Sequence, residues 1–280
     1  MTLLPTAPRT LAVRTPDELD IRVQEWGAGS GPELLFIHGF SQCGLCWAQQ
    51  TGAEVLAPFR RVTYDFRGHG GSDKPLDPAA YRDGRLWADE LAAVIRAAGL
   101  SRPVLVGWSY AGRIIGDYLL HHGTADIAGI VFVDAATHNA REFYGTCNRL
   151  MRQMCSADLA DNIAATRTFL RRCFAAEQPR ELMETLLAFN MVVPAQVRAN
   201  LFDRTADYDA VLRALDVPVL VTQGTHDEVV APAMAHFLAE IIPGARLALF
   251  EGVGHAPFLE APEAFNGALL HFLNTDVAGD

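Results

Sequence analysis

The chain has 280 residues, of which 50% are hydrophobic and 20% charged, a composition typical of a globular protein with a sizeable core. Its formal net charge of −10 argues against a partner that is nucleic acid or an anionic membrane surface. No segment approaches the ~20 apolar residues of a membrane span, and residues 1–15 lack the apolar run of a signal peptide. We therefore expect a cytoplasmic protein.

The five cysteines are an odd number for a disulfide framework, so we expect reduced thiols. Cys43 and Cys46 form a C-x-x-C pair. A redox role for this pair is an alternative, but the thioredoxin-type context of the motif is missing.

Short apolar runs that end near glycine recur along the chain and are continuous rather than alternating, which is typical of parallel strands buried on both faces. They cover residues 33–39, 61–68, 103–109, 129–135, 218–224 and 245–252. Two earlier runs near residues 11–14 and 20–25 alternate apolar with polar residues and suit an antiparallel edge.

Helical patterns separate these strands at residues 81–100, 110–123, 232–242 and 262–275. Alternating strands and helices predict a doubly wound, mostly parallel α/β sheet. From residue 137 to about residue 215 only helical patterns occur. We therefore predict a core formed by residues 1–136 and 216–280, with residues 137–215 inserted as a helical cap.

The stretch GWSYAG places Ser109 at a sharp turn between a predicted strand and a predicted helix. Such a turn holds the serine in a left-handed conformation and requires small residues two positions away on each side, here Gly107 and Ala111. Alanine at the second position is a mild departure from the usual glycine. The ordinary alternative is a serine that merely caps the helix.

A serine nucleophile needs a base, an orienting acid and an oxyanion hole. Asp227 and His255 each follow a predicted strand, and they occur in the order Ser, Asp, His. The backbone N–H groups of Phe40 and Tyr110 are placed to form the oxyanion hole. No spacing among the histidines suggests a metal site.

With these motifs the chain resembles the α/β-hydrolase superfamily over roughly residues 20–275. The stretches DFRGHGGSDKP (65–75) and GHAPFLEAPEAF (254–265) resemble further motifs of that superfamily. The resemblance is nearest to the cofactor-free haloperoxidase and esterase branch with a helical cap. It implies a serine in the position where dehalogenases and epoxide hydrolases have aspartate, which disfavours those two activities.

The resemblance leaves alternatives for the acid. Asp134 ends the preceding strand, where some relatives carry the acid, and Glu228 is adjacent to Asp227. Asp65 and Arg67 are interpreted as a buried turn network, and His38 and His69 as structural or pocket-wall residues.

Phe40, Trp108 and Tyr110 flank the serine, and the cap adds apolar side chains. We expect His38, Trp108 and Phe143 to line a pocket for a small, largely apolar, uncharged ester. A core position is an equal alternative for Trp108.

The sequence thus predicts a serine hydrolase that forms an acyl-enzyme and needs no cofactor or metal. Perhydrolase or haloperoxidase-like activity, lactonase activity and C–C bond hydrolysis use the same groups and stay open. A ligand receptor with a residual hydrolase site is an alternative of another class. The expected partner is a small-molecule substrate, and a homodimer is kept open.

Overall fold

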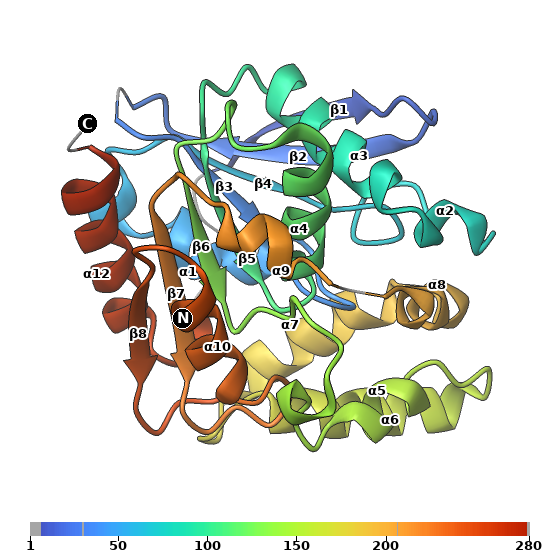
Figure 1. Ribbon diagram of the computed structural model, residues 1–280. Helices are drawn as coiled ribbons and strands as arrows, with labels where there is room; N and C mark the ends of the chain where they lie inside the picture. Colours follow the sequence, from blue (N-terminus) through green and yellow to red (C-terminus); the bar gives the residue numbers. More distant parts are fainter. Residues whose placement is uncertain (1–6, 30, 206, 279–280) are drawn as a thin grey trace.

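Eight strands form one sheet in the computed structural model, which describes residues 7–29, 31–205 and 207–278 (Figure 1). The expectation for residues 1–6 of the N-terminal segment lies outside these ranges. The strands are β1 (Arg9–Arg14), β2 (Asp20–Trp26), β3 (Leu34–Ile37), β4 (Arg61–Tyr64), β5 (Val104–Trp108), β6 (Gly129–Val133), β7 (Val219–Gly224) and β8 (Arg246–Phe250). Their order across the sheet is β1-β2-β4-β3-β5-β6-β7-β8.

The pairing confirms the predicted fold class. The pairs β3–β4, β3–β5, β5–β6, β6–β7 and β7–β8 are parallel, whereas β1–β2 and β2–β4 are antiparallel. Every residue of β3, β4, β5, β6 and β7 is buried, as expected for strands covered on both faces. The prediction of a fully buried strand was wrong for β8, where only Phe250 is buried, because β8 is the edge of the sheet.

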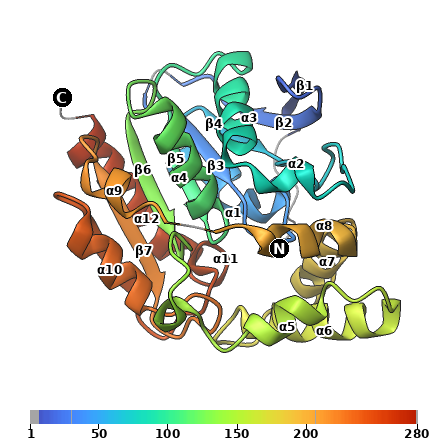
Figure 2. The same cartoon turned by 45° about the vertical axis from the view of Figure 1, so that its right-hand side comes forward.

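Two groups of helices cover the opposite faces of the sheet (Figures 1 and 2). On one face α3 packs on α4, and α9 contacts both α4 and α10; on the other, α1, α11 and α12 contact one another. Their bounds are α3 (Gly84–Ala97), α4 (Ala111–His122), α9 (Asp209–Arg213), α10 (Ala233–Ile241), α1 (Ala48–Thr51), α11 (Pro257–Glu260) and α12 (Pro262–Phe272).

The helix predicted over residues 81–100 is divided in two. A short α2 (Ala79–Arg82) ends before Asp83, whose backbone is extended (φ −80°, ψ 119°). The Asp83 side chain accepts a hydrogen bond from the Arg85 N–H, so it caps α3. Because Asp83 forms the N-cap of α3, it separates α2 from α3 although the apolar pattern continues through it.

The segment between β6 and β7 is helical, as predicted, and most of it lies across the ends of the strands (Figures 1 and 2). It contains α5 (Asn148–Gln153), α6 (Leu159–Arg172), α7 (Arg180–Met191) and α8 (Ala195–Asn200) before α9 returns to the sheet. The fully buried Arg198 ties these helices together. It donates hydrogen bonds to the carbonyls of Met154 and Asn190 and to the side chains of Asn162 and Thr166.

One-turn 3₁₀ helices at Gly44–Trp47, Glu54–Leu56, Arg141–Phe143 and Leu201–Asp203 and a π-turn at Leu273–Val277 complete the described elements. No helix among the described residues is long and apolar enough to cross a membrane.

Candidate active site

Ser109 occupies the turn between β5 and α4 with a left-handed backbone (φ 56°). A Cβ added at Gly107 would lie 2.5 Å from Ile115 Cδ1 and 3.2 Å from Ala111 Cβ, which explains the small residues on both sides of the serine. The Ser109 N–H donates to the Val133 carbonyl at 2.9 Å. Because a non-glycine residue rarely adopts this conformation, the turn stores strain at the position where the hydroxyl is presented.

His255 and Asp227 lie together although 28 positions separate them, because the loops after β7 and β8 are neighbours. His255 Nδ1 is 2.7 Å from Asp227 Oδ2, and both side chains are buried. Asp227 Oδ1 accepts hydrogen bonds from the N–H groups of Val229 (2.7 Å) and Val230 (3.1 Å). A proton on Nδ1 leaves Nε2 of the neutral ring unprotonated and able to act as a base.

The backbone of His255 is fixed to the serine turn. The indole Nε1–H of Trp108 donates to the His255 carbonyl at 2.7 Å, and the two rings lie 5.4 Å apart. Trp108 directly precedes Ser109 in the chain. The histidine loop and the turn at the serine are therefore held to each other by one buried hydrogen bond.

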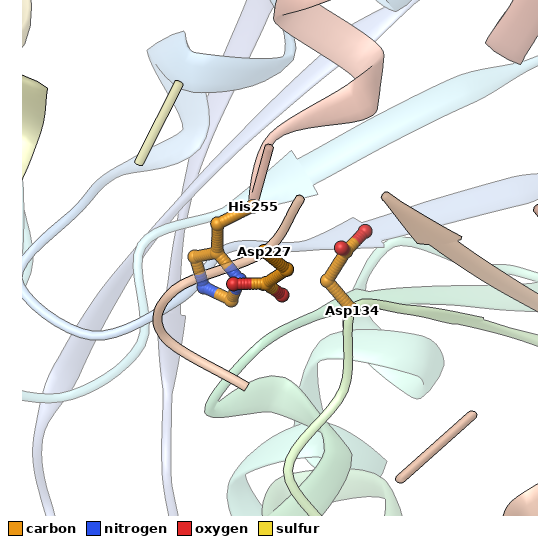
Figure 3. Close-up of side chains that lie close together, drawn as sticks. All are labelled: Asp134, Asp227 and His255. Atoms are coloured by element: carbon orange, nitrogen blue, oxygen red, sulfur yellow. The ribbon is translucent and has the colours of Figure 1, made fainter. Parts of the chain in front are cut away.

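Asp134, the alternative acid, does not hydrogen-bond to His255. Its Oδ1 accepts from Gln223 Nε2 (2.9 Å) and from the Gly224 N–H (3.0 Å), and Gln223 also donates to Asp227 Oδ2 at 2.9 Å. Figure 3 shows the Asp227 carboxyl between the His255 ring and Asp134. Burial, and then the charge of Asp227, raise the pKa of Asp134 well above its usual value.

Glu228, the other alternative, faces away from this pair. Its carboxylate is paired with Arg172 and its side chain is 45% exposed. An exposed carboxylate already paired with arginine is a poor partner for a buried imidazole. The geometry therefore favours Asp227 over both alternatives.

Two groups among the described residues bring three metal-type ligand atoms within 4.8 Å of one another. In the first, Asp134, Asp227 and His255, the oxygens of Asp227 already accept hydrogen bonds from protein donors. These donors make the group a hydrogen-bonded network and a poor fit for a cation. The second group, His138, Asp207 and Asp209, shares no residue with the cavity described below.

The backbone N–H groups of Phe40 and Tyr110 donate no hydrogen bond to any residue in the described part of the chain. Both residues line the same cavity as Ser109. Gly39 brings the loop after β3 close to the serine, since a Cβ there would lie only 3.1 Å from Ser109 Cβ. Two unpaired donors beside the serine suit an oxyanion.

Ser109 opens into a cavity of about 440 Å³ between the core and the cap. Apolar and aromatic residues form part of its wall, and the remainder is polar and basic. The lining residues are Phe40, Ser109, Tyr110, Arg113, Ala136, Asn139, Tyr144, Asn148, Arg149, Met151, Arg152, Leu201, Phe202, Arg204, Val229 and Val230. The sequence predicted a largely apolar pocket, whereas four arginines contribute to the wall of this cavity.

His38, Trp108 and Phe143 were expected in the pocket wall, but the structure places each elsewhere. His38 is fully buried and stacks on Phe66 at 3.9 Å, Trp108 packs edge-on against Phe258, and Phe143 packs against Phe237 at 5.0 Å. None of the three lines the cavity of Ser109.

His38 supports the backbone just before Phe40, one of the two candidate oxyanion-hole residues, without lining the cavity. Its Nδ1 donates to the Gly39 carbonyl (2.9 Å), which leaves Nε2 to accept from the Phe66 N–H (3.3 Å). Burial lowers the pKa of His38 to about 4, so the ring stays neutral at ordinary pH. The neutral ring fixes the carbonyl just before Phe40.

The turn network after β4 is confirmed. Asp65 accepts hydrogen bonds from the N–H groups of Gly44 and Gly71, both at 2.7 Å. The buried Arg67 pairs with Glu90 and Asp17, each at 2.9 Å. His69, also buried, accepts from the Ser41 N–H at 3.2 Å, so this loop also supports the segment after Phe40.

All five cysteines are free thiols, as expected. Cys43 and Cys46 are buried, and burial raises the pKa of both thiols. Because the thiolate is the reactive form, this environment disfavours a redox role for the C-x-x-C pair.

Sequence reasoning missed the arginines of the cavity. Arg113 follows the serine turn by one helical turn, and Arg149 and Arg152 lie within the cap segment REFYGTCNRLMRQMC. Their spacing of three residues places Arg149 and Arg152 on one face of α5, a signal that the sequence carries. Nothing in the sequence says that this face meets the serine.

Three comparisons with known proteins show what the chain is similar to. The model of a family described as "Alpha/beta hydrolase family" matches residues 34–268. A non-heme chloroperoxidase from Kitasatospora aureofaciens, CPO-A1, is 28% identical over 275 residues, covering 93% of this chain and 98% of the relative. The esterase RhEst1 from Rhodococcus sp. ECU1013 is 34% identical with a TM-score of 0.86, covering 96% of this chain and 99% of its own. A protein from Burkholderia cenocepacia, provisionally assigned as an aryl esterase, is 36% identical with a TM-score of 0.90, covering 95% of this chain and 98% of its own.

Proposed function

Because the chain belongs to the α/β hydrolase family, we propose that it is a serine hydrolase that cleaves a carboxylic ester through an acyl-enzyme. The observation that carries the proposal is the buried pair of His255 and Asp227, 2.7 Å apart, which the Trp108 hydrogen bond ties to the turn of a left-handed Ser109 that opens into a cavity. The esterases among the similar structures support the same reaction class.

In the acylation step His255 Nε2 takes the proton of the Ser109 hydroxyl as the oxygen attacks the ester carbonyl. The carbonyl oxygen becomes an oxyanion, which the N–H groups of Phe40 and Tyr110 stabilise. His255 then gives the proton to the leaving alkoxide as the C–O bond breaks, so one alcohol is released and Ser109 carries the acyl group. Asp227 stabilises the imidazolium through Nδ1.

In the deacylation step a water molecule takes the place of the alcohol. His255 removes one of its protons, the new C–O bond forms and the bond to Ser109 breaks. The proton returns to the serine oxygen and the carboxylic acid leaves. The sum of the two steps is ester plus water to acid plus alcohol.

The test is the burst of p-nitrophenol from p-nitrophenyl acetate and butyrate, together with intact mass of the trapped protein. We expect a burst and one acyl adduct on the parent protein, and neither on Ser109→Ala. Ser101→Ala is the matched control, because it removes an exposed serine hydroxyl that does not line this cavity. Equal turnover by the parent and Ser109→Ala would refute the proposal.

A second candidate is supported by the similarity to the chloroperoxidase. Hydrogen peroxide can replace water in deacylation, which gives a peracid and free Ser109 from the same acyl-enzyme. Adding peroxide during ester turnover measures the split between acid and peracid. Peracid formation that is lost in Ser109→Ala would support perhydrolysis as a second activity of this site.

A further inference from the structure

The cavity that contains Ser109 is positively charged, whereas the chain is acidic. The sequence has 33 acidic and 23 basic side chains, yet four arginines and no aspartate or glutamate line this cavity within the described residues. Arg113 belongs to α4 of the core, Arg149 and Arg152 belong to α5, and Arg204 follows the 3₁₀ helix Leu201–Asp203. A positively charged cavity in an acidic protein indicates a site for a ligand with a negative charge.

Within the part of the chain that the structure describes, one of the four arginines is neutralised by an acid. Arg204 forms a buried ion pair with Asp117 and donates to the Tyr110 hydroxyl at 3.3 Å. Arg113 is buried and donates to two neutral acceptors, the Arg204 carbonyl at 3.0 Å and the Asn139 side chain. Its charge is satisfied by hydrogen bonds but not balanced by a carboxylate.

The other two arginines have no acidic partner in the described part of the chain. Arg149 and Arg152 lie on one face of α5, are exposed, and both line the cavity. The guanidinium carbon of Arg152 lies 5.2 Å from the Phe202 ring centroid, so this side chain stacks on the apolar wall. A stacked guanidinium keeps its N–H groups free to bind an anion.

Part of the wall of this cavity is apolar. Met151, Leu201 and Phe202 line the cavity together with Arg149 and Arg152. An aliphatic spacer would pack on this wall, with the reacting carbonyl at one end and a charged group at the other. A volume of about 440 Å³ is in the range of sites for small molecules.

We propose that this cavity selects esters that carry an anionic group, a carboxylate, a few carbons from the scissile bond, with Arg149 and Arg152 as its binding residues. The inference rests on the proposed function and names the substrate class of the same site. A phosphonate or phosphate group offers the same chemistry from another source. The arginine fork binds carboxylate in a bidentate manner, which specifies the anion as well as attracting it.

The experiment compares two methyl esters that differ only in charge, monomethyl adipate and methyl adipamate. Methanol release is measured with the parent, with the double variant Arg149→Gln/Arg152→Gln, and with Arg167→Gln/Arg171→Gln. The last variant removes the same charge from exposed positions of the cap that lie outside this cavity. The methyl ester of phosphonovaleric acid is included to separate phosphonate from carboxylate.

We expect the parent to prefer the carboxylate ester over the carboxamide ester by about tenfold in kcat/KM, mainly through KM. The preference should fall to about twofold or less in Arg149→Gln/Arg152→Gln and persist in Arg167→Gln/Arg171→Gln. Because both arginines are exposed, it should also weaken in about 0.5 M salt. A phosphonate ester preferred over the carboxylate would keep the anionic class and change the group.

Equal kcat/KM for the two esters, or a preference unaffected by Arg149→Gln/Arg152→Gln, would overturn the inference. Binding is also measured without turnover, as the thermal shift of Ser109→Ala by each ester, so that a protein inactive on both still gives an answer. A larger shift with the carboxylate that needs Arg149 and Arg152 supports the inference. The proposed function fails by a different result, namely ester hydrolysis that survives Ser109→Ala. The two failures can therefore be distinguished.

Discussion

The carboxyl of Asp134 provides the sharpest test of the buried network behind the site. Its side chain is fully buried, and Oδ2 has no hydrogen-bond partner in the described part of the chain. The groups that face it are Asp227, Gln223, the Gly224 N–H and, further away, the charge of Glu260. Burial and the two neighbouring acids outweigh the two N–H donors and favour a protonated Asp134 in the folded protein.

The consequence is a loss of stability as pH rises. Because the pKa of Asp134 is raised in the folded state, the folded protein keeps a proton that the unfolded chain releases above its ordinary pKa of 3.8. The contribution of this proton to the free energy of unfolding is therefore complete below pH 3.8. Above that pH it declines by about 1.4 kcal/mol per pH unit until the pH reaches the pKa of Asp134 in the folded protein. The loss therefore begins above pH 3.8 and continues for as long as the folded protein retains the proton.

Asp134→Asn removes the titration and keeps a side-chain oxygen for Gln223 and Gly224. Urea denaturation at about pH 5 and about pH 7 should show the variant gaining stability relative to the parent as pH rises, with a limiting slope of about 1.4 kcal/mol per pH unit. The control is Asp126→Asn, an exposed aspartate with no hydrogen bond among the described residues. Parallel stability profiles for the parent and Asp134→Asn would refute the reasoning, since they would mean that Asp134 is ionised in both states.

Three further changes test the geometry around the serine. Asp227→Asn should lower kcat by about 10³–10⁴ with the fold intact, because His255 loses the charge that fixes its tautomer; ester kinetics and circular dichroism measure both. Gly39→Ala would place a Cβ 3.1 Å from Ser109 Cβ and should lower kcat about 10²-fold without a comparable loss of melting temperature. Trp108→Phe removes the hydrogen bond to the His255 carbonyl and should cost about 1 kcal/mol in thermal denaturation, and an unchanged melting temperature would show that this bond contributes nothing.

The fold could be predicted from the sequence because its strongest signals are local. Continuous apolar runs gave the buried strands, and the alternating runs near β1 and β2 gave the antiparallel edge. The errors came where tertiary position overrides pattern. β8 has the apolar residues of a central strand but lies at an edge, and Asp83 interrupts an apolar helical pattern by capping α3.

The places of the candidate catalytic residues in the fold were predictable for a related reason, whereas their catalytic roles stay a prediction. Ser109, Asp227 and His255 each follow a strand of one parallel sheet, so their meeting at one end of the sheet follows from topology. The pocket was not predictable in the same way. His38 and Trp108 are next to site residues in the chain, but side-chain direction decides whether a neighbour faces the cavity or the core, and both face the core.

The arginines show why specificity is harder to predict than chemistry. Arg149 and Arg152 reach the site through the fold of the inserted cap, whose position depends on packing around the buried Arg198 and on contacts with the core. The cap residues contribute no group to the proposed bond-breaking steps, so they can change without loss of the reaction. We infer that the sheet determines that an ester is cleaved, and that α5 determines which ester is held long enough for cleavage.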